Sequence, residues 1–417
     1  MRLNLIREWF GVPRLLAGLM LLAFLGQTVW LVHREIGSGD APESAEATRI
    51  GEGWKQWHGR GIAGATFGDF ASSAAADSFG AHAWGDASGF DTERSPLIYL
   101  VSAAPLLAWP GDFDLATAGY WRWLPRLPFI ACGLFLGASL WYVARRLCGY
   151  AGGFIALTFY CFSPALIQAS AAWHIEPQIF GAWGAFGTVF TAIAVAHTLY
   201  APREVVLWNW RRIVLLGVSL AIAIASQFSM VVLLPIALGF LLYVAPVRRG
   251  AGMVIWIAAC LVGFILLFAD YFFHPHTFVH AMRHATFWGA TWRGFAVPGV
   301  PYQLAREIGR ACPALAVALP IAVVVYVAWP RTRYFGNTAP LLTALIFLAL
   351  GMSHTDSASY GFPLASVPFL FVFVAGVLAD LIDEDTRYRA LTTAGVVGLL
   401  AAYAVWSVVN LAGVPIG

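Results

Sequence analysis

Residues 12–32, VPRLLAGLMLLAFLGQTVWLV, decide the fold class of this chain. A run of about 20 apolar residues is what an α-helix needs to cross a hydrocarbon layer roughly 30 Å thick. The run is too long for the apolar region of a signal peptide and lacks a convincing cleavage site, so we expect a permanent membrane helix. The composition agrees, with 60% hydrophobic and 11% charged residues. Because only helices and closed barrels satisfy the backbone inside lipid, and no alternating strand pattern is present, the sequence predicts an all-α polytopic transmembrane protein.

Further apolar runs follow along the whole chain and predict about eleven crossings within a single membrane-embedded domain, residues 1–417. Residues 96–110, PLIYLVSAAPLLAWP, are too short for a comfortable crossing and carry prolines at both ends and in the middle. They predict a re-entrant or interfacial helix. The predicted spans are about 12–33, 124–144, 150–169, 178–200, 212–228, 230–246, 251–272, 312–329, 338–353, 363–382 and 391–411.

Arginines set the expected orientation, because short basic loops favour the cytoplasmic side. Arg2, Arg7 and Arg14 place the N-terminus inside, and five later arginine pairs or clusters fall on the same side if residues 96–110 do not cross. This topology predicts a multi-pass membrane protein with a cytoplasmic N-terminus, and we expect its location to be a bacterial inner (plasma) membrane. It places residues 34–123 and 273–311 in two outer, periplasmic or extracellular loops.

Composition also argues against several kinds of site. The five cysteines lie in or beside apolar segments with no CxxC pair, so neither disulfides nor a zinc-thiolate site is expected. A net charge of +3 gives no sign of nucleic-acid binding. His276, His280 and His284 recur at a spacing that lines one helix face, but one straight helix usually supplies only two metal ligands. We therefore predict no protein metal site, and leave a divalent cation carried by a phosphate as an open possibility.

The first outer loop concentrates charge: ten of the 22 acidic residues lie between residues 35 and 93. Within it, Asp40-Ala-Pro-Glu43 follows closely after the first span, where a carboxylate can act as a general base. The alternative, favoured for any single acid taken alone, is a solvated acidic loop. Near-helical spacing of Ala45, Ile50, Trp54 and Trp57 predicts short amphipathic helices, and the Gly/Ala/Ser-rich residues 61–92 predict an irregular loop.

Other polar groups interrupt or border the apolar spans. Each has a plain structural alternative: a membrane-interface boundary, an interfacial cap, a polar turn or an aromatic belt. A His/Arg stripe facing phosphate is a further interpretation of the histidine-rich segment. The groups are Glu93-Arg94, His174 with Glu176, Gln227 in its turn, the stripe of His280 and Arg283, and the aromatic residues Trp288, Trp292, Phe295 and Tyr302.

Taken in order, these pieces resemble the polytopic C-type membrane glycosyltransferases, in particular the relatives of protein O-mannosyltransferases and aminoarabinose transferases. The resemblance covers most of residues 12–240 and returns at 360–376, and the fixed order of the motifs carries it. Besides the acidic motif, these are SPLIYLVSAAPLL (95–107), RLPFIACGLFLGASLWYVARRLCG (126–149), FSPALIQAS (162–170), GVSLAIAIASQFSMVVLLP (217–235) and YGFPLASVPFLFVFVAG (360–376).

The resemblance implies transfer of a sugar from a polyprenyl-phosphate donor to a glycan, lipid or protein acceptor at the outer membrane face, with inversion at the anomeric carbon. It implies Asp40 as the catalytic base, with Glu43 and Glu176 in support. It further implies donor-phosphate contacts from Arg94, Gln227, His280 and Arg283, and substrate contacts from His174, Trp288 and Tyr360.

Three positions depart from the family pattern. The usual Asp-Glu pair is interrupted by Ala41, a lysine is replaced by Gln227, and an arginine before Tyr360 is replaced by Ser359. The missing cations favour a second hypothesis, a non-catalytic membrane subunit that binds a partner protein through residues 61–92. A third, a transporter of lipid-linked substrates, is disfavoured because the spans hold few buried charges, mainly His197 and Asp270.

Overall fold

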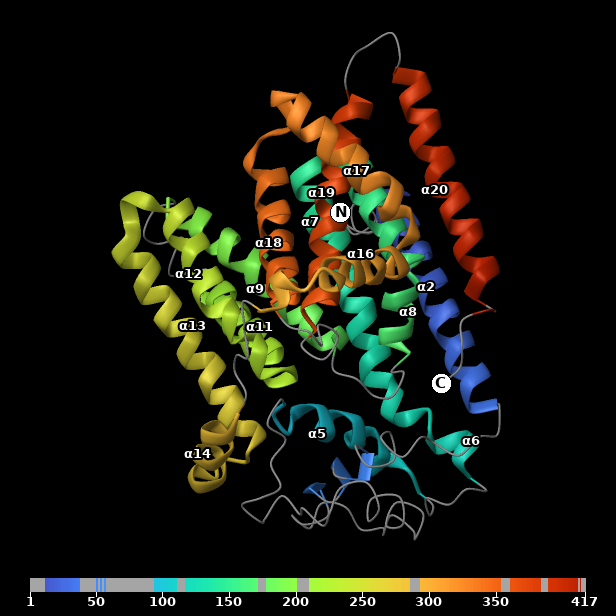
Figure 1. The fold of residues 1–417 in the computed structure, drawn as a ribbon. Helices are drawn as coiled ribbons and strands as arrows, with labels where there is room; N and C mark the ends of the chain where they lie inside the picture. The colour runs from blue at the N-terminus through green and yellow to red at the C-terminus, as the bar shows by residue number, and fades with distance from the viewer. Residues whose placement is uncertain are drawn as a thin grey trace, which may run out of the picture. The chain divides into compact units, whose positions relative to one another are not determined.

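The structure, a computed structural model, is predominantly helical in the part of the chain that it describes, and no strand occurs among those residues (Figure 1). This confirms the predicted all-α class. The described residues are 12–37, 50–51, 53–54, 56–57, 94–110, 117–171, 178–200, 210–285, 293–353, 361–383, 389–411 and 413.

Contacts along the chain divide it into two compact units, which are described separately below. Both units draw on segments that are distant in sequence. The first unit comprises Met1–His33, Ile130–Ala171 and Ala290–Gly417, and the second comprises Arg34–Phe129 and Ala172–Gly289.

Each predicted span overlaps helical residues, but not one helix each, because 124–144 and most of 150–169 both lie in α7 (Leu127–Cys161) and 150–169 continues into α8 (Pro164–Ser170). Seven helices in the described ranges are long and apolar enough to cross a membrane, or eight if the bent pair α16 (Gly299–Ala311) and α17 (Pro313–Ala328) forms one span. The predicted spans at 212–228 and 230–246 correspond to the shorter helices α11 (Trp210–Ser226) and α12 (Leu233–Val244). The seven lie at Val12–Ile36, Gly119–Cys161, Gln178–Thr198, Pro246–Asp270, Phe335–Met352, Phe362–Asp383 and Arg389–Leu411.

Helix α7 (Leu127–Cys161) contains the predicted boundary between two spans as a kink. Cys148 and Gly149 leave the helical conformation there, and Gly149 takes a φ of +71°. Glycine reaches this left-handed region without a Cβ clash, so the chain reverses local direction at this point at little cost. The basic pair Arg145-Arg146 lies just before the kink, where the sequence predicts a short basic loop between the spans 124–144 and 150–169.

In the first unit, α19 (Phe362–Asp383) is the central helix. It is buried continuously from Phe362 to Ala379 and contacts α16, α17, α18 (Phe335–Met352) and α20 (Arg389–Leu411). A helix that is apolar all round buries itself inside a bundle. Phe371 stacks on Phe159 of α7 with ring centroids 5.7 Å apart, so aromatic packing joins α19 to the kinked helix.

A group of polar side chains stabilises the break between α7 and α8 (Pro164–Ser170) in the same unit. The Phe162 carbonyl there accepts hydrogen bonds from Tyr403 OH (2.9 Å) and Ser407 Oγ (2.6 Å) of α20. Ser163 Oγ donates to the Ala311 carbonyl at 2.6 Å. Backbone groups released by a helix break inside a membrane need such partners. The final helix thus completes the hydrogen bonding of the break.

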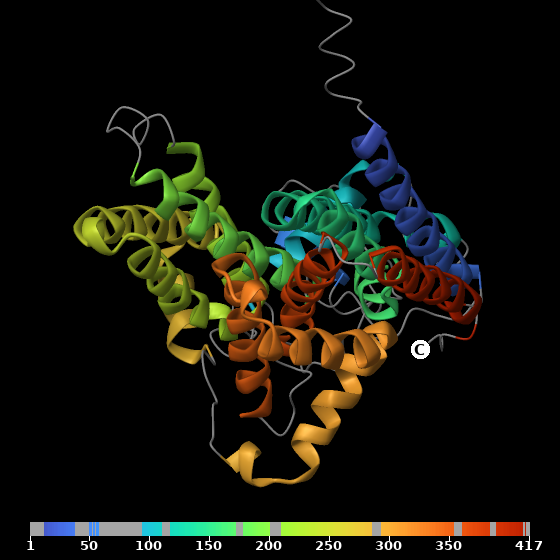
Figure 2. The same ribbon diagram turned by 90° about the horizontal axis from the view of Figure 1, so that it is seen from above.

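The second unit contains a bundle of α9 (Gln178–Thr198), α11, α12 and α13 (Arg249–Asp270), coloured green to yellow in Figures 1 and 2. Its helices approach closely because small residues face each other. A Cβ built on Gly184 of α9 would lie 2.5 Å from the backbone nitrogen of Ala223, and one on Gly217 of α11 would lie 2.6 Å from the carbonyl oxygen of Ala259. Small residues at such crossings allow the backbone contact on which membrane helix association depends.

Replacing Gly184 with leucine is expected to lower the free energy of unfolding by about 3 kcal/mol, because α9 and α11 must separate to admit the side chain. Gly239→Leu is the matched control, since a Cβ at Gly239 of α12 would meet no atom within 4 Å. Denaturant unfolding of the purified chain in mixed micelles measures both. Equal midpoints for the two variants would contradict close packing at Gly184.

Candidate active site

Residues 96–110 form two short helices, α5 (Leu97–Ala103) and η1 (Ala104–Ala108), in the second unit. This confirms that the segment is helical and shorter than a full span; its re-entrant or interfacial position stays a prediction. Pro105 and Pro110 limit helix length, and the side chains of Ile98, Tyr99 and Leu100 are buried.

The predicted amphipathic helix in the first outer loop packs against α5. Its described positions within residues 50–57 are helical, and Ile50 and Trp54 are buried. Trp57 Nε1 donates to the Leu100 carbonyl at 3.1 Å. The hydrophobic spacing seen in the sequence therefore marks the face that covers α5.

Ser95 fixes the start of α5. Its backbone N–H donates to the Ala225 carbonyl at 3.0 Å, and its hydroxyl donates to Asp270 Oδ2 at 3.2 Å and accepts from the Leu97 N–H at 3.2 Å. Ser95 is fully buried. These three hydrogen bonds, which we call the Ser95 clamp, hold the chain beside Arg94 against the ends of α11 and α13.

The clamp brings two of the predicted phosphate-binding positions to one end of α11. Arg94 directly precedes Ser95, and Gln227 follows Ala225 by two positions. Gln227 is buried in an extended conformation between α11 and η4 (Phe228–Val232), and its carbonyl accepts from the Met230 N–H at 3.0 Å. Arg94 is half-buried. A guanidinium group and a side-chain amide are both able to donate hydrogen bonds to a phosphate oxygen.

Asp270 also belongs to this region, although the sequence marks it only as a buried charge. It ends α13, and its carboxylate accepts the Ser95 hydroxyl. An ionisable group at the end of an apolar helix usually has a specific partner. This rule indicates that Asp270 has a specific partner, but it does not show that the partner is Ser95.

The predicted histidine stripe lies on α14 (Pro275–His284). His276 and Arg283 are exposed and His280 is half-buried, while Phe278 and Ala281 on the other face pack with Tyr271. Within the described part of the chain, no three His, Cys, Asp or Glu side chains converge in a way that could hold a metal ion.

The turn between α13 and α14 is strained. Phe272 and Phe273 adopt φ values of 52° and 58°, a left-handed conformation that bulky residues rarely take. Aromatic contacts hold it: Phe273 lies edge-on to Phe268 with centroids 5.3 Å apart, and Phe272 lies edge-on to Trp57 at 5.9 Å. The turn sets the direction in which α14, with its histidines, leaves α13.

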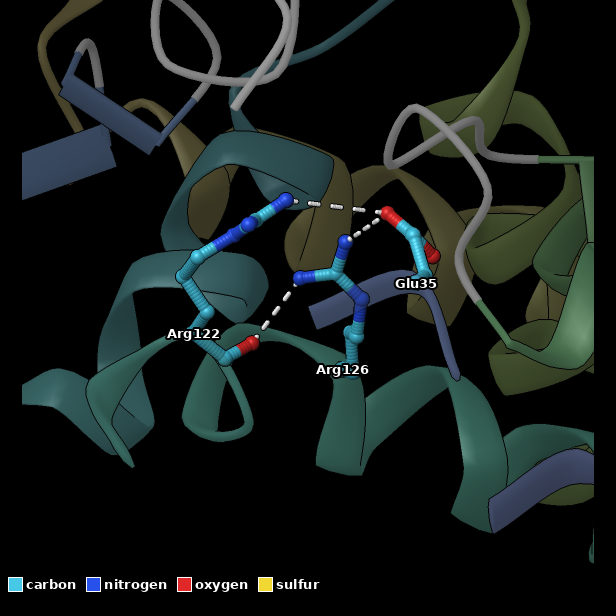
Figure 3. A network of polar contacts seen from close by, with 3 residues as sticks. All are labelled: Glu35, Arg122 and Arg126. Carbon is cyan, nitrogen blue, oxygen red and sulfur yellow. Dashed lines mark hydrogen bonds and ion pairs between the residues drawn. The ribbon is translucent and has the colours of Figure 1, made fainter. Parts of the chain in front are cut away.

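Glu35, Arg122 and Arg126 form a buried charged network that the sequence analysis did not identify (Figure 3). Glu35 Oε1 lies 2.5 Å from Arg126 Nη2 and 3.8 Å from Arg122 Nη2, and Arg126 Nη1 donates to the Arg122 carbonyl at 2.9 Å. Arg126 is completely buried. Two cations share one carboxylate here, five positions before Asp40 in the sequence.

Six predicted site residues lie outside the residues that the structure describes, so their roles stay predictions. They are Asp40, Glu43, His174, Glu176, Trp288 and Tyr360.

A second polar cluster lies in the first unit, between α18 and α19. Asn337 Nδ2 donates to Asp380 Oδ2 and to the Thr332 carbonyl, both at 3.0 Å. Burial, with Cys148 and Asp380 nearby, raises the pKa of Tyr334 well above its usual range. Gly376 leaves the space that Asn337 fills, because a Cβ there would overlap Asn337 Oδ1. This cluster fixes the packing of α18 on α19.

No protein-family profile and no curated protein sequence matches the chain. Among solved structures, ArnT from Cupriavidus metallidurans in the apo state is similar, with 12% identity and a TM-score of 0.55 over 94% of this chain and 75% of that one.

Two structures of an oligosaccharyltransferase from Archaeoglobus fulgidus are also similar, each at 10% identity. One, in complex with Zn and sulfate, has a TM-score of 0.48 over 76% of this chain and 44% of its own. The other, AglB with an inhibitory peptide and a dolichol-phosphate, has a TM-score of 0.49 over 78% of this chain and 48% of its own. The chain therefore spans less than half the length of each archaeal protein.

The likeness to ArnT extends over nearly the whole chain and shows that the chain has the fold of a C-type membrane glycosyltransferase. It confirms the resemblance at the level of fold, and with it the predicted polytopic helical class.

Proposed function

We propose that this protein is a membrane glycosyltransferase that transfers a sugar from a polyprenyl-phosphate donor to an acceptor at the outer membrane face, with inversion. The observation that carries the proposal is the ArnT-like fold over 94% of the chain. The Ser95 clamp supports it, because it holds Arg94 at the end of α11 that also carries Gln227.

The proposed reaction needs few protein groups. An acceptor hydroxyl attacks the anomeric carbon on the face opposite the phosphate, and Asp40 takes the hydroxyl proton. The bond between the anomeric carbon and the phosphate oxygen breaks as the new bond forms, which inverts the configuration at that carbon. The polyprenyl phosphate leaves as an anion, so no acid has to protonate it. Arg94 stabilises the negative charge on the leaving phosphate through charge-assisted hydrogen bonds. In this proposal Glu43 and Glu176 are supporting carboxylates for the catalytic base Asp40.

Arg94→Gln is expected to raise the KM for the donor about 10- to 100-fold, the effect of losing one hydrogen bond to a charged group. In the Arg94→Gln background, Gln227→Lys is expected to recover part of the loss, because the clamp puts both positions at the same end of α11. Arg94→Lys is the conservative control. Initial rates at varied donor concentration give the KM. A Gln227→Lys substitution that rescues nothing would show that position 227 does not reach the phosphate.

The test of the function itself uses the full chain in proteoliposomes with radiolabelled polyprenyl-phosphate hexoses and pentoses. Transfer of label to a glycan, lipid or peptide acceptor supports the proposal, and an added chelator tests dependence on a divalent cation. A correctly folded chain that consumes none of the donors supports the second candidate, a non-catalytic subunit. The glutamine at position 227, where the family carries lysine, favours that candidate.

A further inference from the structure

Helix α16 of the first unit has two chemically different faces. Val300, Leu304 and Ala311 are buried, and the helix contacts α17, α19, α18 and α8. Tyr302, Arg306 and Arg310 recur every four residues and are exposed, with Tyr302 71% exposed. Residues four apart lie along one side of a helix, so these three side chains form a continuous strip, which we call the α16 basic face.

The two arginines of this face form no ion pair within the described residues, and Glu307 is the acidic residue nearest to them along the helix. Across the described ranges, Arg306 and Arg310 take part in no hydrogen bond or ion pair, in contrast to Arg122 and Arg126. Like charges one turn apart destabilise a helix. An anion bound between the two guanidinium groups offsets that repulsion and uses their forked donors, whose geometry matches a phosphate.

The angle between α16 and α17 bears on which kind of anion could reach these arginines. The two helices meet at a bend of 111° at Cys312, visible in Figure 2 as a sharp change of direction. The outward side of α17 exposes Val317, Ile321 and Val324, which is suited to lipid tails. If α17 crosses the membrane, α16 runs roughly along its plane. Arginine and tyrosine on such a helix lie at the level of the lipid headgroups.

We propose that the α16 basic face binds the headgroup phosphates of anionic phospholipids in the surrounding leaflet. The exposed apolar side chains of α17, the helix that directly follows the basic face in the chain, favour a membrane lipid over a soluble acidic peptide. Each arginine strengthens the attraction of the helix to an anionic lipid surface. The amphipathic ring of Tyr302 is suited to the same headgroup level. The proposal does not depend on the glycosyltransferase activity.

The test titrates short-chain phosphatidylglycerol into the full chain in neutral detergent and follows hydrogen–deuterium exchange of residues 299–311. Wild-type protein is expected to exchange more slowly as this lipid is added, and phosphatidylcholine should give no protection. The variant R306Q/R310Q is expected to bind phosphatidylglycerol about 30-fold more weakly, the effect of removing two surface arginines. R306K/R310K retains the charges and should retain most of the binding.

A matched control removes the same charge elsewhere: R211Q/R212Q alters an exposed pair at the start of α11 and should leave protection of 299–311 unchanged. Thermal unfolding of R306Q/R310Q is expected to match wild type, since both side chains are exposed. Protection that persists in R306Q/R310Q overturns the proposal. So does protection by polyprenyl phosphate or an acidic peptide but not by phosphatidylglycerol, which assigns the face to another ligand.

Discussion

Asp40→Asn is expected to lower the rate of sugar transfer about 10²- to 10⁴-fold, the contribution of a positioned general base. Asparagine has nearly the same shape as aspartate but cannot take the acceptor proton. Because the donor phosphate is bound by other groups in the proposed mechanism, the KM for the donor should change little. Initial rates measured in proteoliposomes over a range of donor concentrations that reaches saturation separate the two parameters.

The first outer loop provides a matched control for this substitution. Glu46→Gln removes one carboxylate from the same acidic segment but lies outside the Asp-Ala-Pro-Glu motif. It should leave the rate within about twofold of wild type, as expected for a solvated surface charge. If both variants retain full activity, Asp40 is not the base, and the acidic loop is solvated. If both lose activity equally, net charge in the loop matters rather than one carboxylate.

Most of the fold follows from apolar run length, because a membrane leaves few alternatives to helices. The sequence alone locates α2 (Val12–Gly37), α9 and α19 closely, as well as the short helices of residues 96–110. The sequence gives less information about the length of a helix that ends at a polar turn. Gln227 ends α11 early, so α11 and α12 are shorter than single full spans.

The segment 273–311 is harder to predict from its sequence. The sequence indicates a long loop there, whereas α14, α15 (Arg293–Ala296) and α16 occupy part of it. The spacing of Val300, Leu304 and Ala311 is an amphipathic signal, but such short segments become helical only when a neighbouring surface covers the apolar face. Here α17 and α19 supply that surface. Periodicity within the segment gives no information about those partners.

The candidate site shows the same division between local and long-range information. Arg94 and Gln227 are identifiable because Arg94 borders an apolar run and Gln227 interrupts one. The Ser95–Asp270 hydrogen bond joins residues 175 positions apart, and the Glu35–Arg126 pair joins residues 91 positions apart. One sequence gives the chemical type of each partner but not the pairing, since helix packing determines which polar groups meet.

Arg126→Met is expected to lower the free energy of unfolding by about 3 kcal/mol, at the lower end of the range for breaking a buried ion pair. Methionine fills a similar volume but leaves Glu35 without its 2.5 Å partner and removes the bond to the Arg122 carbonyl. Arg122, 3.8 Å from the carboxylate, retains part of the compensation. Denaturant unfolding in mixed micelles measures the change. Arg146→Met, at an exposed position, is the control.

A double-mutant cycle separates the charge effect from simple loss of packing. Glu35→Gln alone removes the carboxylate but leaves two buried arginines, so it should also destabilise the fold. The double variant E35Q/R126M removes one charge of each sign and should be more stable than the sum of the single effects predicts, because no buried carboxylate is left uncompensated. Strictly additive losses would show that Arg126 stabilises the unit through volume and its carbonyl hydrogen bond, with the Glu35 contact contributing nothing.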